Sequence, residues 1–224
     1  MNLITIFAIL FPIFGFQAIS FEKAAEEIVQ AGISLNHHQL CPATSGNFSQ
    51  RLDEQLIAVT ASGKHKGELT AEDILIADLE GKVQGSEKKP SAETALHTML
   101  YKQNSEIGAI LHTHSTNGIV LTRLLGFDTS LITEGYEIHK IFPNIGTHES
   151  RIETPIFENT QDIPVLAAKV STYLEEHPLT FGFLIHGHGF YTWGKDMKEV
   201  KNRIEAFEQL FECELKIRTA HGSK

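Results

Sequence analysis

Histidines in an apolar segment are the first sign of chemistry in this sequence. The segment AILHTHSTNG places His112 and His114 two residues apart at the end of an apolar run. Because strand side chains alternate between two faces, residues at this spacing lie on one face and can share a ligand. Neutral imidazole is a common ligand of zinc and similar divalent ions, which need at least a third protein ligand. Two solvent-facing polar residues at a strand end are the simpler alternative.

A second histidine pair follows another apolar, strand-like run. The segment FGFLIHGHGFYTWG carries His186 and His188, again two residues apart. Spacing alone does not show which of the two would be the third ligand. If a three-histidine site exists, at least one of them has another role, such as a hydrogen bond to a loop. The remaining histidines lie singly or in polar segments, where surface or capping roles are the default expectation.

Small hydroxylated residues beside glycine indicate a site for an anion. The segments ATSGNFS and TASGKHKG each allow bare backbone N–H groups to approach a phosphate, and Lys64 adds positive charge beside the second. The segment KPSAE adds Ser91 at the start of an expected helix. Ser-Gly turns are common, so each segment alone is weak evidence. Three of them in a chain with a histidine pair are more suggestive of a phosphate site.

Composition excludes several classes of protein. The chain has 224 residues, 42% of them hydrophobic and 21% charged, which suits one sizeable globular domain. Its formal net charge of -9 argues against a general nucleic-acid binder, because such proteins need basic surface to displace counterions from phosphates. Cys41 and Cys213 are far apart and form no CxxC pair, so neither a disulfide framework nor a thiolate zinc site is indicated. This cysteine usage fits a reducing compartment.

The amino-terminal segment has a different composition from the rest. MNLITIFAILFPIFGFQAISF carries no charge before Glu22 and is apolar enough to imitate a signal or an anchor. It lacks a basic flank and a clear cleavage site, and Pro12 interrupts it. A misassigned start and a membrane-directed segment are the two alternatives, and we treat residues 1–20 as an extension outside the fold.

The elements that must position these residues can be located approximately. A helix is expected over residues 21–35, where apolar positions recur at helical spacing, and another over 91–104. Strands are expected over 55–63 and 73–85, the second with a hairpin at its Glu-Gly pair. The strand with the first histidine pair follows the second helix. Strands and helices alternate without a strict βαβ rhythm.

Five segments of the sequence resemble the motifs of one known family and follow the same order. The segments SGNFS, SGK, PSAET, HTHS and HGHGFYTWG make residues 21–216 resemble the class II aldolase and adducin family. Within it, EGYEIHK, THESRIETPIFENTQDIPVLAAKV and the short LTRLL helix most resemble the bacterial methylthioribulose-1-phosphate dehydratase branch. The resemblance implies an α/β domain over residues 21–224, with a three-layer α/β/α fold and a central, mainly antiparallel sheet. It also implies one zinc ion per subunit and a homotetramer with active sites near subunit boundaries.

The resemblance assigns the metal ligands. His112 and His114 match the first two ligands, and His188 matches the third because it is followed by glycine, a short apolar stretch and another glycine. His186 then falls on a position that need not bind metal.

Two glutamates match catalytic positions of the family. Glu137 in EGYEIHK matches the acid/base residue of the dehydratase branch, with Ile138 in place of a methionine. Glu93 in PSAET matches a glutamate near the metal, for which we expect a supporting role. Without the family, Glu137 would be interpreted as a solvated helix carboxylate.

Further positions match the family's phosphate-binding residues. Ala92 replaces the second serine of the family motif and so removes one hydroxyl contact. The matching residues are Gly46, Asn47, Ser62, Gly63, Lys64 and Ser91.

The resemblance finally implies an activity. The reaction is zinc-dependent dehydration of 5-methylthioribulose 1-phosphate to 5-methylthio-2,3-dioxopentyl phosphate, in methionine salvage. A fuculose-phosphate type of class II aldolase is the alternative enzyme, and a non-catalytic adducin-like module is the third hypothesis. Because a phosphorylated substrate stays in the cytoplasm, we expect a cytoplasmic enzyme with no nucleic-acid or membrane partner, for which residues 1–20 are dispensable.

Overall fold

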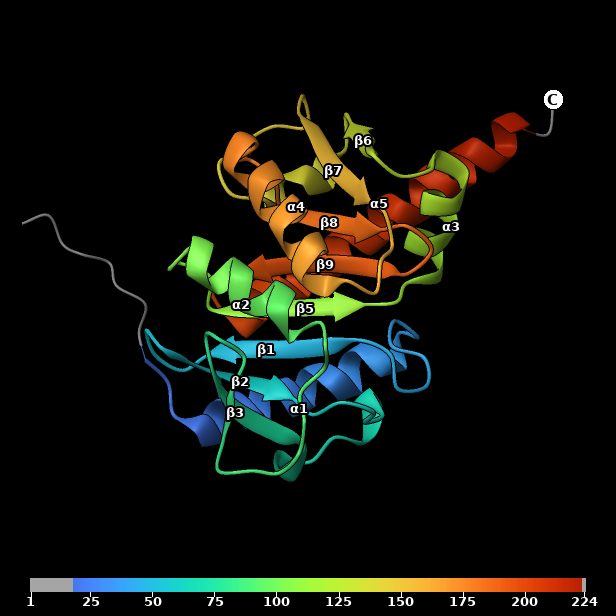
Figure 1. Cartoon of the computed structure of the whole chain (residues 1–224). Helices are drawn as coiled ribbons and strands as arrows, with labels where there is room; N and C mark the ends of the chain where they lie inside the picture. Colours follow the sequence, from blue (N-terminus) through green and yellow to red (C-terminus); the bar gives the residue numbers. More distant parts are fainter. Residues whose placement is uncertain (1–17, 223–224) are drawn as a thin grey trace, which may run out of the picture.

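The computed structural model describes residues 18–222, in which helices and strands alternate (Figure 1). The elements in chain order, with η for short 3-10 helices, are α1 (Phe21–His37), β1 (Asn47–Arg51), β2 (Leu56–Thr60), η1 (Lys66–Glu68), η2 (Ala71–Asp73), β3 (Ile74–Asp78), β4 (Val83–Gln84), α2 (Thr94–Gln103), β5 (Ala109–Thr113), α3 (Thr116–Leu125), β6 (Thr129–Glu134), η3 (Glu137–Ile141), β7 (Arg151–Phe157), α4 (Ile163–Glu176), β8 (Gly182–Ile185), β9 (Gly189–Gly194) and α5 (Met197–Gly222).

Most of the predicted amino-terminal extension lies outside the described residues, and its role stays a prediction. Its last residues are described and begin the fold, because the Ser20 hydroxyl accepts a hydrogen bond from the backbone N–H of Lys23 and so caps α1. The backbone N–H of Ile19 donates to the carbonyl of Leu52. None of the helices within residues 18–222 combines the length and apolar character needed to cross a bilayer.

All nine strands of the described chain form one sheet in the order β4-β3-β2-β1-β5-β9-β8-β7-β6. Every neighbouring pair is antiparallel except β7 and β8, so the predicted mainly antiparallel sheet is confirmed. At the centre, His112 on β5 lies opposite Asn47 on β1 and Tyr191 on β9. This register brings together three segments that are far apart in the sequence.

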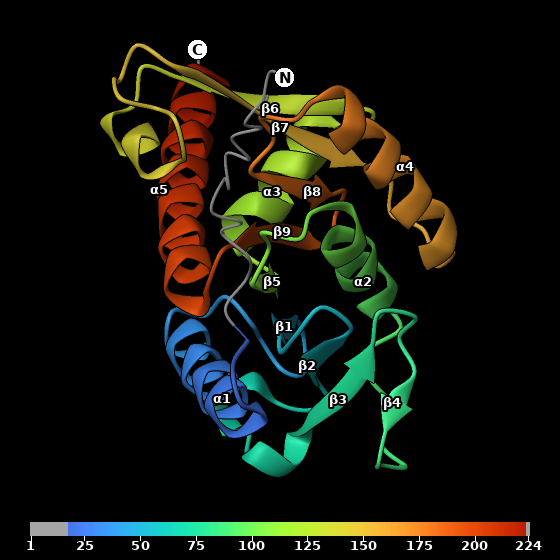
Figure 2. The ribbon, with the colours of Figure 1, turned by 90° about the vertical axis from the view of Figure 1, so that its left-hand side faces the viewer.

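Helices cover both faces of the sheet. Helices α1, α3 and α5 lie on one face and α2 and α4 on the other, as Figure 2 shows. Each face has its own apolar core, since one buried cluster includes Ile28 of α1 and Phe207 of α5 whereas the other includes Leu100 of α2 and Val170 of α4. The predicted three-layer α/β/α architecture is therefore confirmed.

The local predictions agree with the structure to within a few residues. The first expected helix is α1, and the expected strand with its hairpin is β3 and β4. The helix expected from residue 91 begins only at Thr94, because Pro90 forms an isolated bridge with Ala61 and the chain then turns. The helix after the first histidine pair, α3, is longer than the LTRLL segment that predicted it.

Candidate active site

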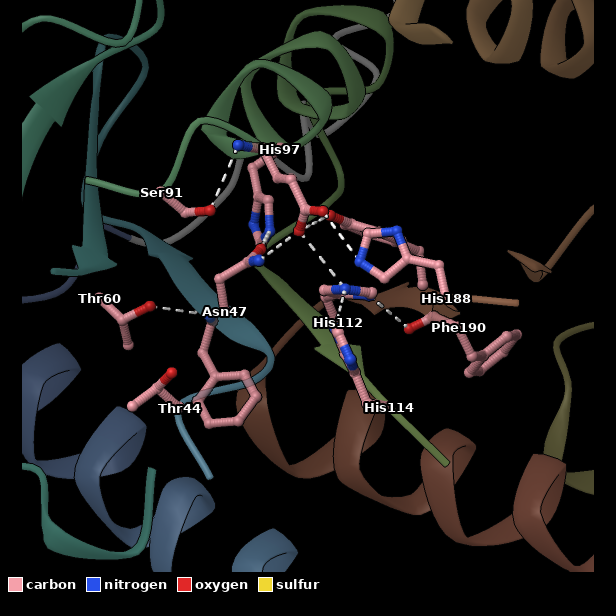
Figure 3. Close-up of polar contacts among 12 residues, drawn as sticks. Thr44, Asn47, Thr60, Ser91, His97, His112, His114, His188 and Phe190 are labelled. Carbon is pink, nitrogen blue, oxygen red and sulfur yellow. Dashed lines mark hydrogen bonds and ion pairs between the residues drawn. The ribbon is translucent and has the colours of Figure 1, made fainter. Parts of the chain in front are cut away.

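Three histidines from two sheet segments converge at the centre of the molecule. His112 is on β5, His114 directly follows that strand, and His188 lies in the turn between β8 and β9 (Figure 3). The Nε2 atoms of His112 and His114 are 3.0 Å apart, and the ligand atoms of all three histidines lie within 4.8 Å of one another. The structure thus brings together the three residues predicted as metal ligands.

The protonation of these histidines suits metal binding. The Nδ1 atom of His112 lies 3.1 Å from the carbonyl oxygen of Phe190, so Nδ1 carries the hydrogen and the lone pair of Nε2 faces the cluster. Burial lowers the pKa of His112, and burial together with neighbouring His188 lowers the pKa of His114 to about 4. Both rings are therefore neutral at pH 7, and a set of neutral imidazoles fits a divalent transition metal.

The two candidates for the third ligand have different surroundings. His186 packs edge-to-face against Phe127, with ring centroids 5.4 Å apart, whereas His188 packs against His112 and His114. Gly189 allows this approach, because a Cβ there would lie 2.3 Å from the carbonyl oxygen of Thr113. The geometry therefore agrees with His188 rather than His186 as the ligand.

Glu93 lies directly against the histidine cluster. Its Oε1 is 3.0 Å from Nε2 of His188, and its Oε2 is 3.4 Å from Nε2 of His112. Asn47 Nδ2 and the Tyr191 hydroxyl also donate to Oε2, at 2.7 and 2.9 Å. Although burial raises it, the contacts with His188 and His112 hold the pKa of Glu93 well below its ordinary value. Glu93 is thus an ionised carboxylate among potential metal ligands.

A cavity of about 390 Å³ joins the cluster to the predicted phosphate segments. Gly46 is required in its wall, because it has a φ of +80° and a Cβ there would lie 2.7 Å from the carbonyl oxygen of His112. The lining residues that were predicted to bind phosphate are Gly46, Asn47, Ser62, Gly63 and Ser91. His114, His188 and Glu93 line the same cavity, so one ligand can reach both groups.

Lys64 lies apart from the other predicted phosphate residues, and its role in phosphate binding stays a prediction. Its ammonium lies 2.9 Å from Oδ1 of Asp73 and does not line the cavity. Lys66 lines it instead, with its buried ammonium donating to the carbonyl oxygens of Thr44 and Lys64 at 3.0 and 2.6 Å. Burial lowers the pKa of Lys66. Both lysines belong to the segment GKHKG, and nothing in their spacing indicates which one turns inward.

Sequence reasoning also missed other residues of the wall. The Ser45 hydroxyl is buried there and has no hydrogen-bond partner among the described residues, although it belongs to the ATSGNFS segment. The polar run 159–161, between β7 and α4, lines the cavity as well. In the sequence this run is a polar stretch just before a helix that begins with a proline. Such a pattern predicts a helix amino terminus but does not by itself indicate a ligand site.

Glu137 does not lie with the cluster within the described chain. It begins η3, its side chain is 70% exposed, and it is not among the residues that line the cavity. Its carboxylate accepts a hydrogen bond from Lys140 and lies 3.9 Å from Nδ1 of His148. The hydrogen bond from Lys140 lowers the pKa of Glu137. Its catalytic role stays a prediction.

Comparison with known sequences reveals relatives that share about half of their residues with this chain. A methylthioribulose-1-phosphate dehydratase of Pseudomonas aeruginosa is 52% identical over 196 residues, which cover 88% of this chain and 95% of the relative. The enzyme of the same name from Marinobacter nauticus is 47% identical over 200 residues, covering 89% of this chain and 96% of the relative.

Solved structures have the same fold at lower identity. YgbL from Klebsiella pneumoniae has a TM-score of 0.74 at 25% identity, covering 88% of this chain and 90% of the other. The L-fuculose-1-phosphate aldolase of Thermus thermophilus has a TM-score of 0.71 at 24% identity, covering 91% and 99%, which shows the fold alone. The family model of the Class II Aldolase and Adducin N-terminal domain matches residues 26–215. The chain therefore belongs to the class II aldolase and adducin family.

Proposed function

We propose that this chain dehydrates methylthioribulose 1-phosphate, the reaction after which relatives that share about half of its residues are named. The observation that carries the proposal is the 47–52% identity to these dehydratases over almost nine tenths of the chain. The cavity is chemically suitable, since it combines histidines that can hold a metal with hydroxyl and backbone groups that can hold a phosphate.

The chemistry follows from the substrate. The ketone at C2 acidifies the hydrogen on C3, and a bound divalent metal supplies positive charge that stabilises the negative charge developing on the substrate oxygens. A carboxylate accepts the C3 proton and then protonates the C4 hydroxyl, which leaves as water. The remaining enol becomes a ketone by tautomerisation. The product is 5-methylthio-2,3-dioxopentyl phosphate, an intermediate of methionine salvage.

We assign the acid/base role to Glu137 and a supporting role to Glu93. Glu137 is exposed and lies outside the cavity of its own chain, whereas Glu93 contacts two of the three histidines. In a homotetramer with active sites at subunit boundaries, Glu137 would serve the cavity of a neighbouring subunit. Partly exposed apolar residues in the same segment, such as Ile141, would then be covered by that neighbour.

We propose zinc as the metal and the three histidines as its protein ligands. Three neutral imidazoles are a common zinc donor set and leave coordination positions for substrate oxygens. Imidazole also binds iron and manganese, so elemental analysis of protein purified without added metal decides the identity. We expect close to one zinc per chain.

An aldolase is the alternative function. Such an enzyme would use the same metal and phosphate groups but would break the C3–C4 bond. The likeness to the fuculose-phosphate aldolase concerns the fold, while identity to the dehydratases is about twice as high. A non-catalytic module would not need its metal histidines, and all three are present here.

A product assay tests the function directly. The purified chain is incubated with 5-methylthioribulose 1-phosphate, and the products are identified by mass spectrometry. A product lighter than the substrate by one water is expected. Two shorter carbonyl fragments would establish the aldolase alternative, and an unchanged substrate with metal-loaded protein would refute both enzymes.

The cellular setting is part of the proposal. A phosphorylated substrate is retained in the cytoplasm, so we place the enzyme there as a homotetramer. Cell fractionation of the full chain, and assay of a version beginning at Phe21, test the location and the dispensability of residues 1–20. A membrane-bound full chain or an inactive shortened chain would contradict this part.

A further inference from the structure

A chain of buried polar side chains leads from Glu93 into the interior. Asn47 Nδ2 donates to Glu93 Oε2, and Asn47 Oδ1 lies 2.5 Å from Nε2 of His97 (Figure 3). On the far side of the ring, Nδ1 of His97 lies 2.6 Å from the Ser49 hydroxyl. That hydroxyl lies 2.9 Å from the hydroxyl of Tyr101. Side chains of helix α2 and strand β1 are thus linked by hydrogen bonds behind the cavity.

The direction of each hydrogen bond can be deduced. The oxygen of Asn47 is only an acceptor, so Nε2 of His97 must carry the hydrogen. Nδ1 of the same neutral ring is then an acceptor, and Ser49 donates to it. The Ser49 oxygen in turn accepts from Tyr101. A flipped Asn47 amide would place its oxygen against the carboxylate of Glu93, so ionised Glu93 and His97 fix the same amide orientation.

Burial makes this arrangement rigid. His97 and Ser49 are completely buried, and Asn47 and Tyr101 are at most 4% exposed. Burial also lowers the pKa of His97 to about 4, so the ring is neutral at pH 7, as the hydrogen-bond directions above require. Polar groups in a low-dielectric interior are costly unless satisfied, and here each has its partner. The amide of Asn47 therefore has one favourable position.

The same contacts leave little of the Asn47 side chain for a substrate. The amide oxygen of Asn47 accepts from His97, and its amide nitrogen donates to Glu93. Asn47 lines the cavity, but its side chain is directed at the carboxylate that contacts His112 and His188.

We propose that His97 and Asn47 are positioning residues: His97 fixes the amide of Asn47, and that amide holds the carboxylate of Glu93 against the metal histidines. This assignment differs from the phosphate-binding role that the family resemblance gives to Asn47. It depends on the proposed function only for its kinetic readout, because metal and phosphate binding can be measured without turnover.

The central experiment compares His97→Leu with His97→Gln. Leucine removes the N–H that donates to Asn47, whereas the terminal amide of glutamine can supply one at similar reach. We expect His97→Leu to lower zinc affinity, measured by chelator competition, and kcat each by about tenfold, the lower end of the range seen when direct partners of metal ligands are removed, because His97 acts through Asn47 and Glu93. The KM and the affinity for inorganic phosphate should change less than about twofold, and His97→Gln should recover most of both losses.

A matched buried histidine provides the control. His139 is also completely buried and also has a hydrogen-bond partner on each ring nitrogen, the hydroxyls of Thr133 and Ser150, but neither partner lines the cavity, whereas Asn47 does. We expect His139→Leu to lower thermal stability while zinc and phosphate affinities stay at the wild-type values. Equal loss of zinc affinity in both leucine variants would mean that His97 has only a structural role.

Asn47→Ala tests whether His97 acts through Asn47. If it does, the double variant Asn47→Ala, His97→Leu should be no worse than Asn47→Ala alone in zinc affinity and kcat. If the losses in the double variant multiply, or if Asn47→Ala lowers phosphate affinity as much as kcat, the proposal is overturned.

If His97→Leu does not fold, the same measurements are made on His97→Gln, Asn47→Ala and Tyr101→Phe. For Tyr101→Phe we expect zinc affinity and kcat to fall by less than about threefold. A wild-type protein without dehydratase activity would refute the proposed function. The zinc and phosphate affinities of the variants would still decide whether His97 and Asn47 are positioning residues.

Discussion

The two candidate catalytic glutamates lie in opposite environments. Glu93 is 15% exposed, lies at the start of α2 and contacts side chains from β1, β5 and β9. Glu137 is 70% exposed, and its ion-pair partners Lys140 and His148 lie within eleven residues of it in the sequence. A buried sheet centre can assemble a site from distant segments of one chain because strand register fixes their relative positions. Glu137, by contrast, makes its ion pairs within its own 3-10 segment and the loop that follows it.

Removal of a metal ligand should have the largest effect on the sheet-centre region. We expect His114→Ala to lose bound zinc and to reduce activity by more than the roughly 100-fold limit for partners of metal ligands. Elemental analysis and a turnover assay measure the two effects. Retention of stoichiometric zinc by this variant would show that the histidine cluster is not the metal site.

Substitution of Glu137 tests directly whether the exposed glutamate is the acid/base residue. Glu137→Gln keeps the shape of the side chain but removes the base, so kcat should fall by about 100- to 10,000-fold while zinc and folding are retained. A near-normal rate in this variant, combined with an inactive Glu93→Gln, would reverse the two roles.

Mixed oligomers test whether Glu137 acts across a boundary. Chains with His114→Ala and chains with Glu137→Gln are each expected to be inactive alone. When the two are co-expressed, some boundaries combine an intact cluster with an intact Glu137, and activity should reappear. Absence of recovery in verified mixed oligomers would place both groups in one chain.

The two lysines of GKHKG provide a smaller, matched contrast. Lys66→Met removes the hydrogen bonds to Thr44 and Lys64 that support the cavity wall, and we expect KM to rise by about tenfold, or 1.4 kcal/mol of binding. Lys64→Met leaves the cavity lining intact, so KM should change less than about twofold. Equal effects on KM would show that Lys64 also reaches the substrate.

The smallest expected effect concerns acid stability. Although burial raises it, hydrogen bonds from Lys64 and Thr70 lower the pKa of Asp73 to about 2 from 3.8. Because the folded-state pKa is depressed, this contribution is fully present above pH 4 and is lost as the pH falls through 2. Lys64→Met should cost about 0.2–1 kcal/mol of unfolding free energy at pH 7, since Lys64 is partly exposed and Lys88 also lies near Asp73. Urea unfolding at pH 7 and pH 2 should show this difference disappearing in acid.

The sequence predicted the parts of the site that depend on strand geometry. The two-residue spacing of His112 and His114 placed both on one face, and their side chains do meet. The family resemblance was needed to choose His188 over His186, because both lie at the same spacing after an apolar run. The layers and the sheet type likewise came from the resemblance and not from the alternation of elements.

The features that could not be predicted depend on tertiary packing. Lys66 rather than Lys64 turns inward because η1 begins there and packs beneath α1, which no local pattern shows. His97 looked like a residue of a polar helix, and its role became visible only when α2 packed on β1 and Asn47 met its ring. Buried polar networks join residues from different elements, so their members are not encoded at a recognisable spacing.

The position of β5 and β9 inside the sheet has a consequence for the stability that a bound metal would give. Each of these strands has a hydrogen-bonded neighbour on both sides, so their amides should exchange with deuterium only when much of the sheet opens. Metal bound at the histidine cluster would therefore stabilise the folded chain against this global opening. Free zinc at 100 times its dissociation constant would add about 2.7 kcal/mol to the unfolding free energy, and the melting temperature would rise with zinc concentration.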